Sequence, residues 1–191
     1  MRGDLVIEIQ TRNFTAIRPK LNILLGNHPV LLVYPIAKVK WIVRQEDGEQ
    51  VSRRRSPRRG RVEDLFYELI YIPNLLKHPN LTLEVVFIEA EEVRRNDGKG
   101  SWRRQGWSIA DRRLVQVLGY ELFRTPADFY KLLPEKLECP FTNHDLAKQT
   151  GLNQSLARRM IYCLQKMNLI EFIGKRGRAR LFEIIQRDQT R

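Results

Sequence analysis

The amino-acid sequence predicts an α+β protein, with a mixed-sheet domain at residues 1–122 and a smaller helical module with a β-hairpin at residues 123–191. Two β-branched runs near the start flank a short helical segment, which is the order of a parallel strand pair with a crossover helix. Glycine-containing turns later in the first part indicate antiparallel hairpins. The last third shows helical periodicity with capping residues instead, which indicates a second domain.

In the first part we expect strands at residues 5–9, 30–34, 39–44 and 81–93. Helices are expected from residue 18 to 25, because Pro19 is tolerated only in a first turn, and at residues 62–76 and 109–118. The Asp47-Gly48 pair predicts a tight turn after the third strand.

The composition indicates a polyanionic partner. The chain has 34 lysines and arginines against 22 aspartates and glutamates, a formal charge of +12. Nucleic acid is the first candidate for such a basic protein, and an acidic membrane surface the second. No apolar run approaches the roughly 20 residues of a membrane span, and the N-terminus lacks the order of a signal peptide. We therefore expect a cytoplasmic protein that does not enter a membrane.

The chain carries few residues for metal or nucleophilic chemistry. Its two cysteines, Cys139 and Cys163, have no Cys or His neighbour at metal-ligand spacing, and the three histidines are far apart in the sequence. No Walker loop, dinucleotide fingerprint or serine-hydrolase signature is present. These observations argue against a zinc site and a disulfide framework.

Six arginines fall within residues 53–61, and we expect this segment to be an exposed loop that contacts a polyanion. The residues concerned are Arg53, Arg54, Arg55, Arg58 and Arg59, with Arg61 beyond them. Trp102 and Trp107 flank another basic stretch. Core packing is the favoured role for both indoles, and stacking against single-stranded bases is the alternative.

The last third predicts three helices and a hairpin. Pro126 opens the first helix, Thr142 caps the second with Asp145 three residues on, and Asn153 caps the third, which ends at Asn168. A strand, a basic turn at residues 174–177 and a returning strand follow.

This order of elements, residues 125–185, resembles the winged-helix family of DNA-binding domains. In that family the third helix enters the major groove and the hairpin contacts the backbone or the minor groove. The resemblance implies two groups of contacts in this chain. The helix would contribute Gln154, Ser155, Arg158, Arg159 and Tyr162, and the hairpin would contribute Lys175, Arg176, Arg178 and Arg180.

Glu8 and Gln10 lie on one side of the first expected strand, which is followed by a helix and a buried strand. This order resembles the core of the PD-(D/E)xK nucleases, and the resemblance implies that Glu8 and Gln10 are catalytic residues and that Glu8 is also a Mg²⁺ ligand. Gln10 stands where the family has lysine. Asp4 would lie about 13 Å from Glu8 along the strand, and it cannot replace the carboxylate of the missing preceding strand. Either the fold is shortened or the native chain is longer.

Three functions follow from these patterns. The first is a DNA-binding protein whose winged helix delivers a nuclease-like domain, which is inactive, truncated, or a Mg²⁺-dependent phosphodiesterase if the missing ligand is supplied. The second is a transcriptional regulator whose N-terminal part dimerises or senses a signal, so the sequence is compatible with a homodimer. The third is a scaffold whose winged helix contacts protein. RNA fits the charge as well as DNA does, and only the groove-reading module favours DNA.

Overall fold

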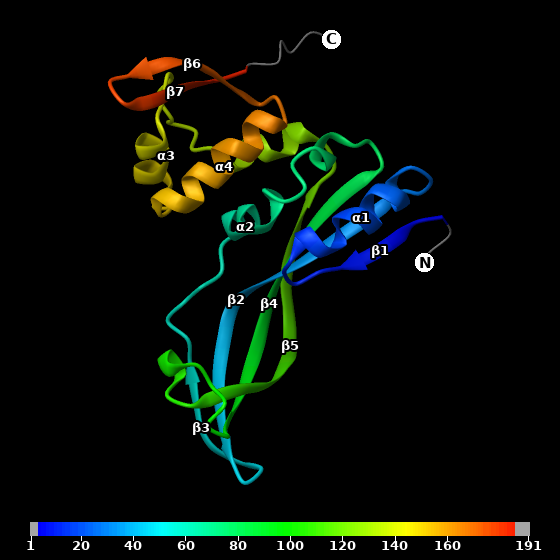
Figure 1. The fold of residues 1–191 in the computed structure, drawn as a ribbon, viewed down its shortest axis with the longest axis vertical. Coiled ribbons are helices and arrows are strands. Elements are labelled where there is room, and N and C mark those ends of the chain that lie inside the picture. The colour runs from blue at the N-terminus through cyan, green and yellow to red at the C-terminus, as the bar shows by residue number, and fades with distance from the viewer. Residues whose placement is uncertain (1–3, 186–191) are drawn as a thin grey trace. The chain divides into compact units, whose positions relative to one another are not determined.

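The computed structural model describes residues 4–185 and has an α+β fold, which confirms the expected class (Figure 1). A mixed five-stranded sheet contains the order β1-β2-β4-β5, with β3 also paired to β2, and a separate two-stranded sheet is formed by β6 and β7. β1 (Val6–Ile9) runs parallel to β2 (Val30–Glu46), and helix α1 (Phe14–Leu25) connects them. The outer ends of the two expected domains, residues 1–3 and 186–191, lie outside this description.

The chain forms two compact units. Unit 1 comprises Met1–Tyr34, Glu63–Glu84 and Leu122–Arg191, and unit 2 comprises Pro35–Val62 and Val85–Glu121. Strands β2, β4 (Leu81–Asn96) and β5 (Trp107–Phe123) contribute residues to both units. Unit 1 therefore unites the expected C-terminal module with the first strand and helix of the chain. No helix within residues 4–185 is long and apolar enough to cross a membrane.

Helix α1 begins at Phe14, four residues before the expected start, and it contains Pro19. Asn13, at the N-cap, is left-handed and makes no side-chain capping bond. The carboxylate of Glu68 accepts a hydrogen bond from the Phe14 N–H at 2.9 Å instead. A tertiary contact thus supplies the cap, which the local sequence does not reveal.

Two expected strands, at residues 30–34 and 39–44, are one continuous strand, β2, that runs through Pro35. The expected helix at residues 62–76 is divided into η1 (Val62–Leu65), α2 (Phe66–Leu69) and η2 (Leu75–Lys77). Pro73 accounts for the break, because proline cannot donate a backbone hydrogen bond in a helix interior.

The expected helix at residues 109–118 is wrong, since this segment lies within strand β5. The apolar residues there fit either period, and the β-branched side chains of Val115 and Val117 disfavour a helix and favour a strand. Of the two tryptophans, Trp107 is buried as expected, whereas Trp102 is 81% exposed in the short turn η3 (Trp102–Arg104), which corrects its expected core role.

The C-terminal part of unit 1 follows the expected order: η4 (Pro126–Leu132), α3 (Asn143–Thr150), α4 (Gln154–Lys166), then the antiparallel strands β6 (Ile170–Arg176) and β7 (Ala179–Ile184). Thr142 and Asp145 form the expected reciprocal capping box, and the Asn153 side chain accepts from the Leu156 N–H at 2.9 Å. Asn168 adopts the left-handed conformation with φ 59°. The local caps that the sequence indicates are therefore confirmed.

The buried core of this part joins the hairpin to the helices. Phe141 pairs with Phe182 through backbone hydrogen bonds of 2.9 and 2.8 Å, and their ring centroids lie 6.1 Å apart. Both side chains are almost completely buried, as are Leu146 of α3 and Met160 of α4. Burial of these rings fixes the base of the hairpin against α3 and α4.

Candidate nucleic-acid interface

Helix α4 has a buried face and a polar face. Leu156, Met160 and Leu164 are buried at spacings of four residues. Gln154, Ser155, Arg158 and Tyr162 are exposed, and Tyr162 keeps 42% of its surface accessible. Residues four apart lie above one another on a helix, so Gln154, Arg158 and Tyr162 form one exposed row. We refer to Gln154, Ser155, Arg158 and Tyr162 as the α4 row.

Arg159, the fifth residue expected in this group, lies elsewhere on the helix. Its guanidinium carbon is 5.4 Å from the ring centroid of Tyr67 in α2, and Arg159 is partly buried. The Tyr67 hydroxyl accepts a hydrogen bond from the Asn153 side chain at 3.0 Å. Tyr67 therefore contacts both the N-cap residue and the second turn of α4. Arg159 packs against Tyr67, whereas Arg158 is exposed.

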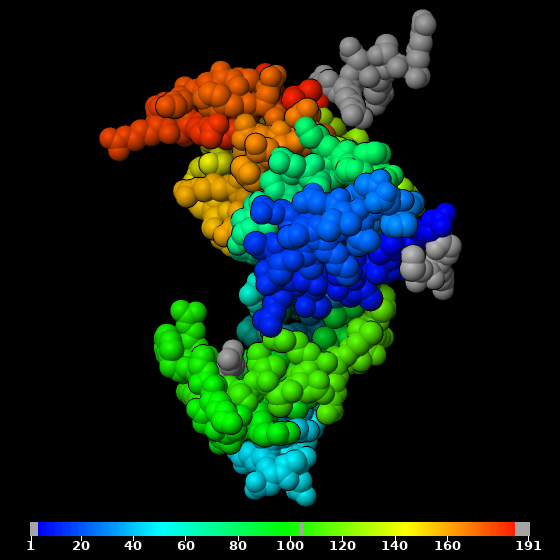
Figure 2. All heavy atoms as spheres, turned by 45° about the vertical axis from the view of Figure 1, so that its right-hand side comes forward, coloured from blue at the N-terminus to red at the C-terminus, as the bar shows by residue number. Residues whose placement is uncertain are grey.

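The hairpin carries four exposed cations at its outer end: Lys175, Arg176, Arg178 and Arg180. In Figure 2 the hairpin atoms (orange to red) project at the surface of unit 1. Lys175 is directly opposite Arg180 across the two strands. Like charges in directly opposed positions destabilise a hairpin, and the phosphates of a nucleic acid would neutralise them. The opposed charges make this end of the hairpin strongly positive, and the Arg180 guanidinium carbon also lies 4.7 Å from the Phe172 ring centroid.

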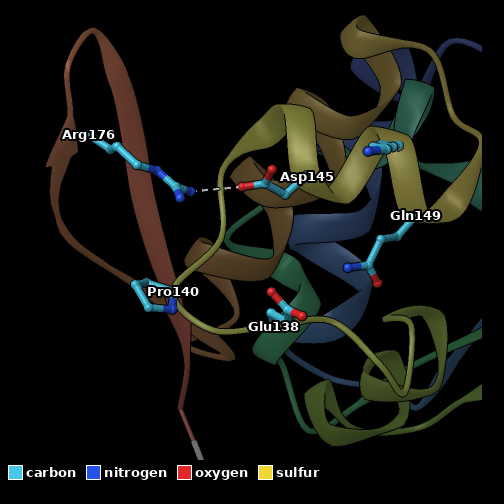
Figure 3. Close-up of a pocket in the computed structure, with 6 residues that line it drawn as sticks. Glu138, Pro140, Asp145, Gln149 and Arg176 are labelled. Carbon is cyan, nitrogen blue, oxygen red and sulfur yellow. Dashed lines mark hydrogen bonds and ion pairs between the residues drawn. The ribbon is translucent and has the colours of Figure 1, made fainter.

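The first turn of α3 joins the α4 row to the hairpin. The Arg176 guanidinium forms an ion pair with the Asp145 carboxylate at 3.1 Å (Figure 3). The neighbouring residue, His144, lies 3.1 Å from the Gln154 side-chain amide through its Nδ1 atom. Residues 144 and 145 thus contact the beginning of α4 on one side and the hairpin on the other. An open pocket of about 410 Å³ lies beside Asp145 and Arg176.

The pKa of Asp145 lies below its usual range, first because the Thr142 backbone N–H donates to the carboxylate and then because the Thr142 hydroxyl and the Arg176 charge also favour the ionised form. Because the pKa of Asp145 is lower in the folded state than in the unfolded state, the ionised carboxylate stabilises the fold. This stabilisation is complete at pH values above the unfolded-state pKa, and it is lost as the pH falls through the folded-state pKa.

We expect Asp145→Ala to lower the free energy of unfolding by about 1 kcal/mol at neutral pH, since it removes the Asp145 half of the capping box and the carboxylate that pairs with Arg176. The difference from the wild type should shrink in acid, where the wild-type carboxylate is protonated. Urea denaturation at neutral pH and at a pH of about 2, well below the ordinary aspartate pKa of about 3.9, measures both values. Glu135→Ala, an exposed substitution outside the helix, is the control. An equal loss at both pH values would show that the carboxylate charge is not responsible.

The arginine run is partly a strand, which corrects the expected loop. Arg53, Arg54 and Arg55 belong to β3 (Glu49–Arg55), where they lie opposite Val43, Ile42 and Trp41 of β2. Arg58 and Arg59 are exposed in the segment that follows. All five belong to unit 2, whereas the α4 row and the hairpin belong to unit 1.

Arg53 is held by its own sheet. Its Nε atom donates to Glu91 at 2.9 Å, and its guanidinium carbon lies 3.8 Å from the Trp41 ring centroid. The Trp41 indole N–H donates to Glu89 at 2.6 Å, and this hydrogen bond is the main reason that the pKa of Glu89 is lowered. Arg53 therefore has a structural role that the sequence did not indicate.

The two nuclease-like residues, Glu8 and Gln10, contact other residues of the N-terminal segment. Glu8 forms an ion pair with Lys20 of α1 at 2.6 Å, and the Gln10 amide donates to the Arg12 carbonyl at 2.6 Å. Within residues 4–185, no three His, Cys, Asp or Glu side chains gather in a group able to hold a metal ion. A single carboxylate paired with an ammonium group does not fit the oxygen-ligand set that Mg²⁺ prefers.

Three further contacts were missed at the level of sequence: Tyr67 against α4, His144 beside Gln154, and Trp41 beneath Arg53. Each joins residues of different elements, so spacing along the chain carries no signal for them. The capping pattern did identify Asp145, although not its ion pair with the hairpin.

Comparison with known proteins gives a family and a relative. Residues 1–124 match the family described as a domain of unknown function, DUF8091. An uncharacterized protein of Treponema pallidum (strain Nichols) is 32% identical over 179 residues, which are 93% of this chain and 70% of that protein. No solved structure matches the chain. The similarity to the Treponema protein extends beyond the matched family domain into the C-terminal part. The chain belongs to the DUF8091 family.

Proposed function

We propose that this protein binds duplex DNA through the α4 row and the β6–β7 hairpin, in the manner of the winged-helix domains that its C-terminal part resembles. The observation that carries the proposal is the first turn of α3, whose residues contact Gln154 at the start of α4 and Arg176 in the hairpin. In this arrangement α4 reads base edges, and the hairpin binds phosphates.

The composition of the α4 row favours DNA over RNA. An exposed helix presenting glutamine, serine and arginine suits the major groove of B-form DNA, which admits a helix and shows distinct hydrogen-bonding patterns. The deep, narrow major groove of A-form RNA does not admit side chains in this way. Duplex DNA is therefore the ligand that this helix and hairpin fit best.

The proposal is limited to binding. The nuclease-like order of elements includes Glu8, but Glu8 belongs to no group of three or more possible metal ligands within the part of the chain that the structure describes. A non-enzymatic DNA binder, the regulator alternative raised by the sequence, agrees better with the Glu8–Lys20 ion pair.

The two neighbouring arginines of α4 provide a test. Arg158→Ala should weaken binding to a preferred sequence by about 1–3 kcal/mol and relax the choice of base, since Arg158 belongs to the exposed row. Arg159→Ala gives the protein the same net charge as Arg158→Ala. It should weaken DNA binding less, because Arg159 lies against Tyr67. Selection of bound sequences from a random duplex library, followed by fluorescence anisotropy, measures both. Equal losses on every sequence for both variants would contradict the assignment of the α4 row to the groove.

A further inference from the structure

Strand β5 presents an apolar row at an edge of the sheet in unit 2. Its exposed apolar residues are Leu114, Val115, Val117, Leu118 and Tyr120, with exposed fractions between 43% and 64%. β5 ends the strand order β1-β2-β4-β5, so no described strand pairs with its outer side. Much of the strand (yellow-green) lies open in Figure 2. A long apolar edge with unpaired backbone groups favours association with another chain.

The opposite edge of unit 2 carries charges, whereas residues 114–120 of β5 contain none. β3 pairs with β2 on that side, and its three consecutive arginines, at positions 53–55, are exposed. Charged side chains on an edge strand oppose pairing with another strand. The two edges of unit 2 therefore differ, and the apolar character of the β5 edge is not shared by the edge at β3.

The exposed apolar side chains lie on both faces of the strand, which restricts the kind of partner. Successive residues of a strand alternate between faces, so Leu114, Leu118 and Tyr120 project to one face and Val115 and Val117 to the other. A helix or a membrane surface would cover a single face. A strand added edge to edge contacts both faces and also satisfies the open backbone groups.

We propose that β5 pairs with β5 of a second copy of this chain, antiparallel across a two-fold axis at Val117. In this register Arg113 lies opposite Glu121 of the other copy, and the symmetry makes that pair twice. Leu114 lies opposite Tyr120, and Val117 lies opposite its own equivalent. The strand is therefore complementary to itself in both charge and apolar character. The inference does not depend on the proposed function.

The charges select this register over its neighbour. A shift of the axis to Gln116 would place Asp111 opposite Glu121, and like charges directly opposite destabilise strand pairing. Within one chain Arg113 contacts Asp111 at 3.0 Å, and both side chains are more than half exposed. Exposed ion pairs contribute little, so Arg113 loses little when it leaves Asp111 for Glu121 of the other copy.

The test uses opposite charges at the axis. In the full chain, Val117→Lys and Val117→Glu should each be monomeric at concentrations where the wild type is dimeric, with the dissociation constant raised at least roughly tenfold. An equimolar mixture of the two variants should form a dimer, because lysine then faces glutamate. Sedimentation velocity measures the mass of each sample. Val51→Lys on the β3 edge is the matched control, since Val51 is 52% exposed against 56% for Val117.

Thermal unfolding checks that the variants fold, and we expect Val117→Lys and Val51→Lys to unfold at similar temperatures when both are diluted until they are monomeric. The proposal is overturned if the wild type is monomeric at about 100 μM, a concentration well above the dissociation constants of ordinary specific dimers. A Val117→Lys variant that is as dimeric as the wild type would also overturn it. So would a mixture of the two charged variants that remains monomeric, or a Val51→Lys control that loses the dimer equally.

Discussion

The triple variant Lys175→Gln, Arg176→Gln and Arg178→Gln is expected to bind duplex DNA about 100-fold more weakly than the wild type at an ionic strength near 0.1 M. These three cations lie at the exposed outer end of the hairpin, where phosphate contacts are proposed. Each lost contact releases about 0.9 fewer counterions, so the slope of log K against log salt should fall in magnitude by about 2.7. Fluorescence anisotropy with a labelled duplex at several salt concentrations gives both quantities.

The matched control removes the same charge from other surfaces of unit 1. Arg18→Gln, Lys77→Gln and Lys136→Gln together also lower the net charge by three, and all three residues are exposed. This control should retain most of the affinity and most of the salt slope. If it loses as much of both as the hairpin variant, binding depends on the net charge of the protein and not on the hairpin.

Phe141→Ala should lower the free energy of unfolding by about 3–5 kcal/mol, because it leaves a cavity in a buried cluster. Phe141 is completely buried and is joined to Phe182 of β7 through backbone hydrogen bonds and ring contact. Loss of the ring should therefore loosen the hairpin from α3 and α4. Urea denaturation followed by tryptophan fluorescence and by far-ultraviolet circular dichroism measures the change.

Phe172→Ala serves as the comparison for Phe141, since Phe172 lies on the same hairpin but is 43% exposed. Its ring is 6.2 Å from that of Phe182, so it contacts the cluster from outside. We expect its loss of stability to be less than half of that for Phe141. Equal losses would mean that the hairpin is not anchored through Phe141.

The sequence predicted the C-terminal part better than the N-terminal part, and local chemistry explains why. Thr142 and Asn153 cap helices through residues three positions on, and Asn168 acts through its own left-handed backbone, so their roles can be read from the local sequence. Helix α1 is different, because the hydrogen-bond acceptor for its first residue comes from Glu68, 54 positions along the chain. The prediction of a helix at residues 109–118 was wrong for a related reason. The apolar residues of this segment fit a helix as well as a strand, and pairing with another strand decides between the two.

In the candidate interface, too, the local sequence predicts some features, and contacts with distant residues decide others. The exposed side chains of the α4 row follow from helical periodicity. The departure of Arg159 toward Tyr67 and the strand position of Arg53 depend on elements far away in the sequence. The ion pair between Arg176 and Asp145 spans 31 residues, and no spacing rule identifies it. Long-range packing therefore decides which of the expected contacts remain available to a ligand.

The central claim is that this chain binds duplex DNA, and a direct titration tests it. The purified chain is added to labelled duplex DNA at several salt concentrations, with and without Mg²⁺, and the products are run on a denaturing gel. We expect binding that weakens steeply with salt and DNA that stays intact in both conditions. Absence of binding at low salt would contradict the claim and indicate a protein partner for the α4 row. If Mg²⁺ causes shortening of the DNA, and Glu8→Ala abolishes that shortening, the protein is a nuclease and the proposal of binding without hydrolysis is wrong.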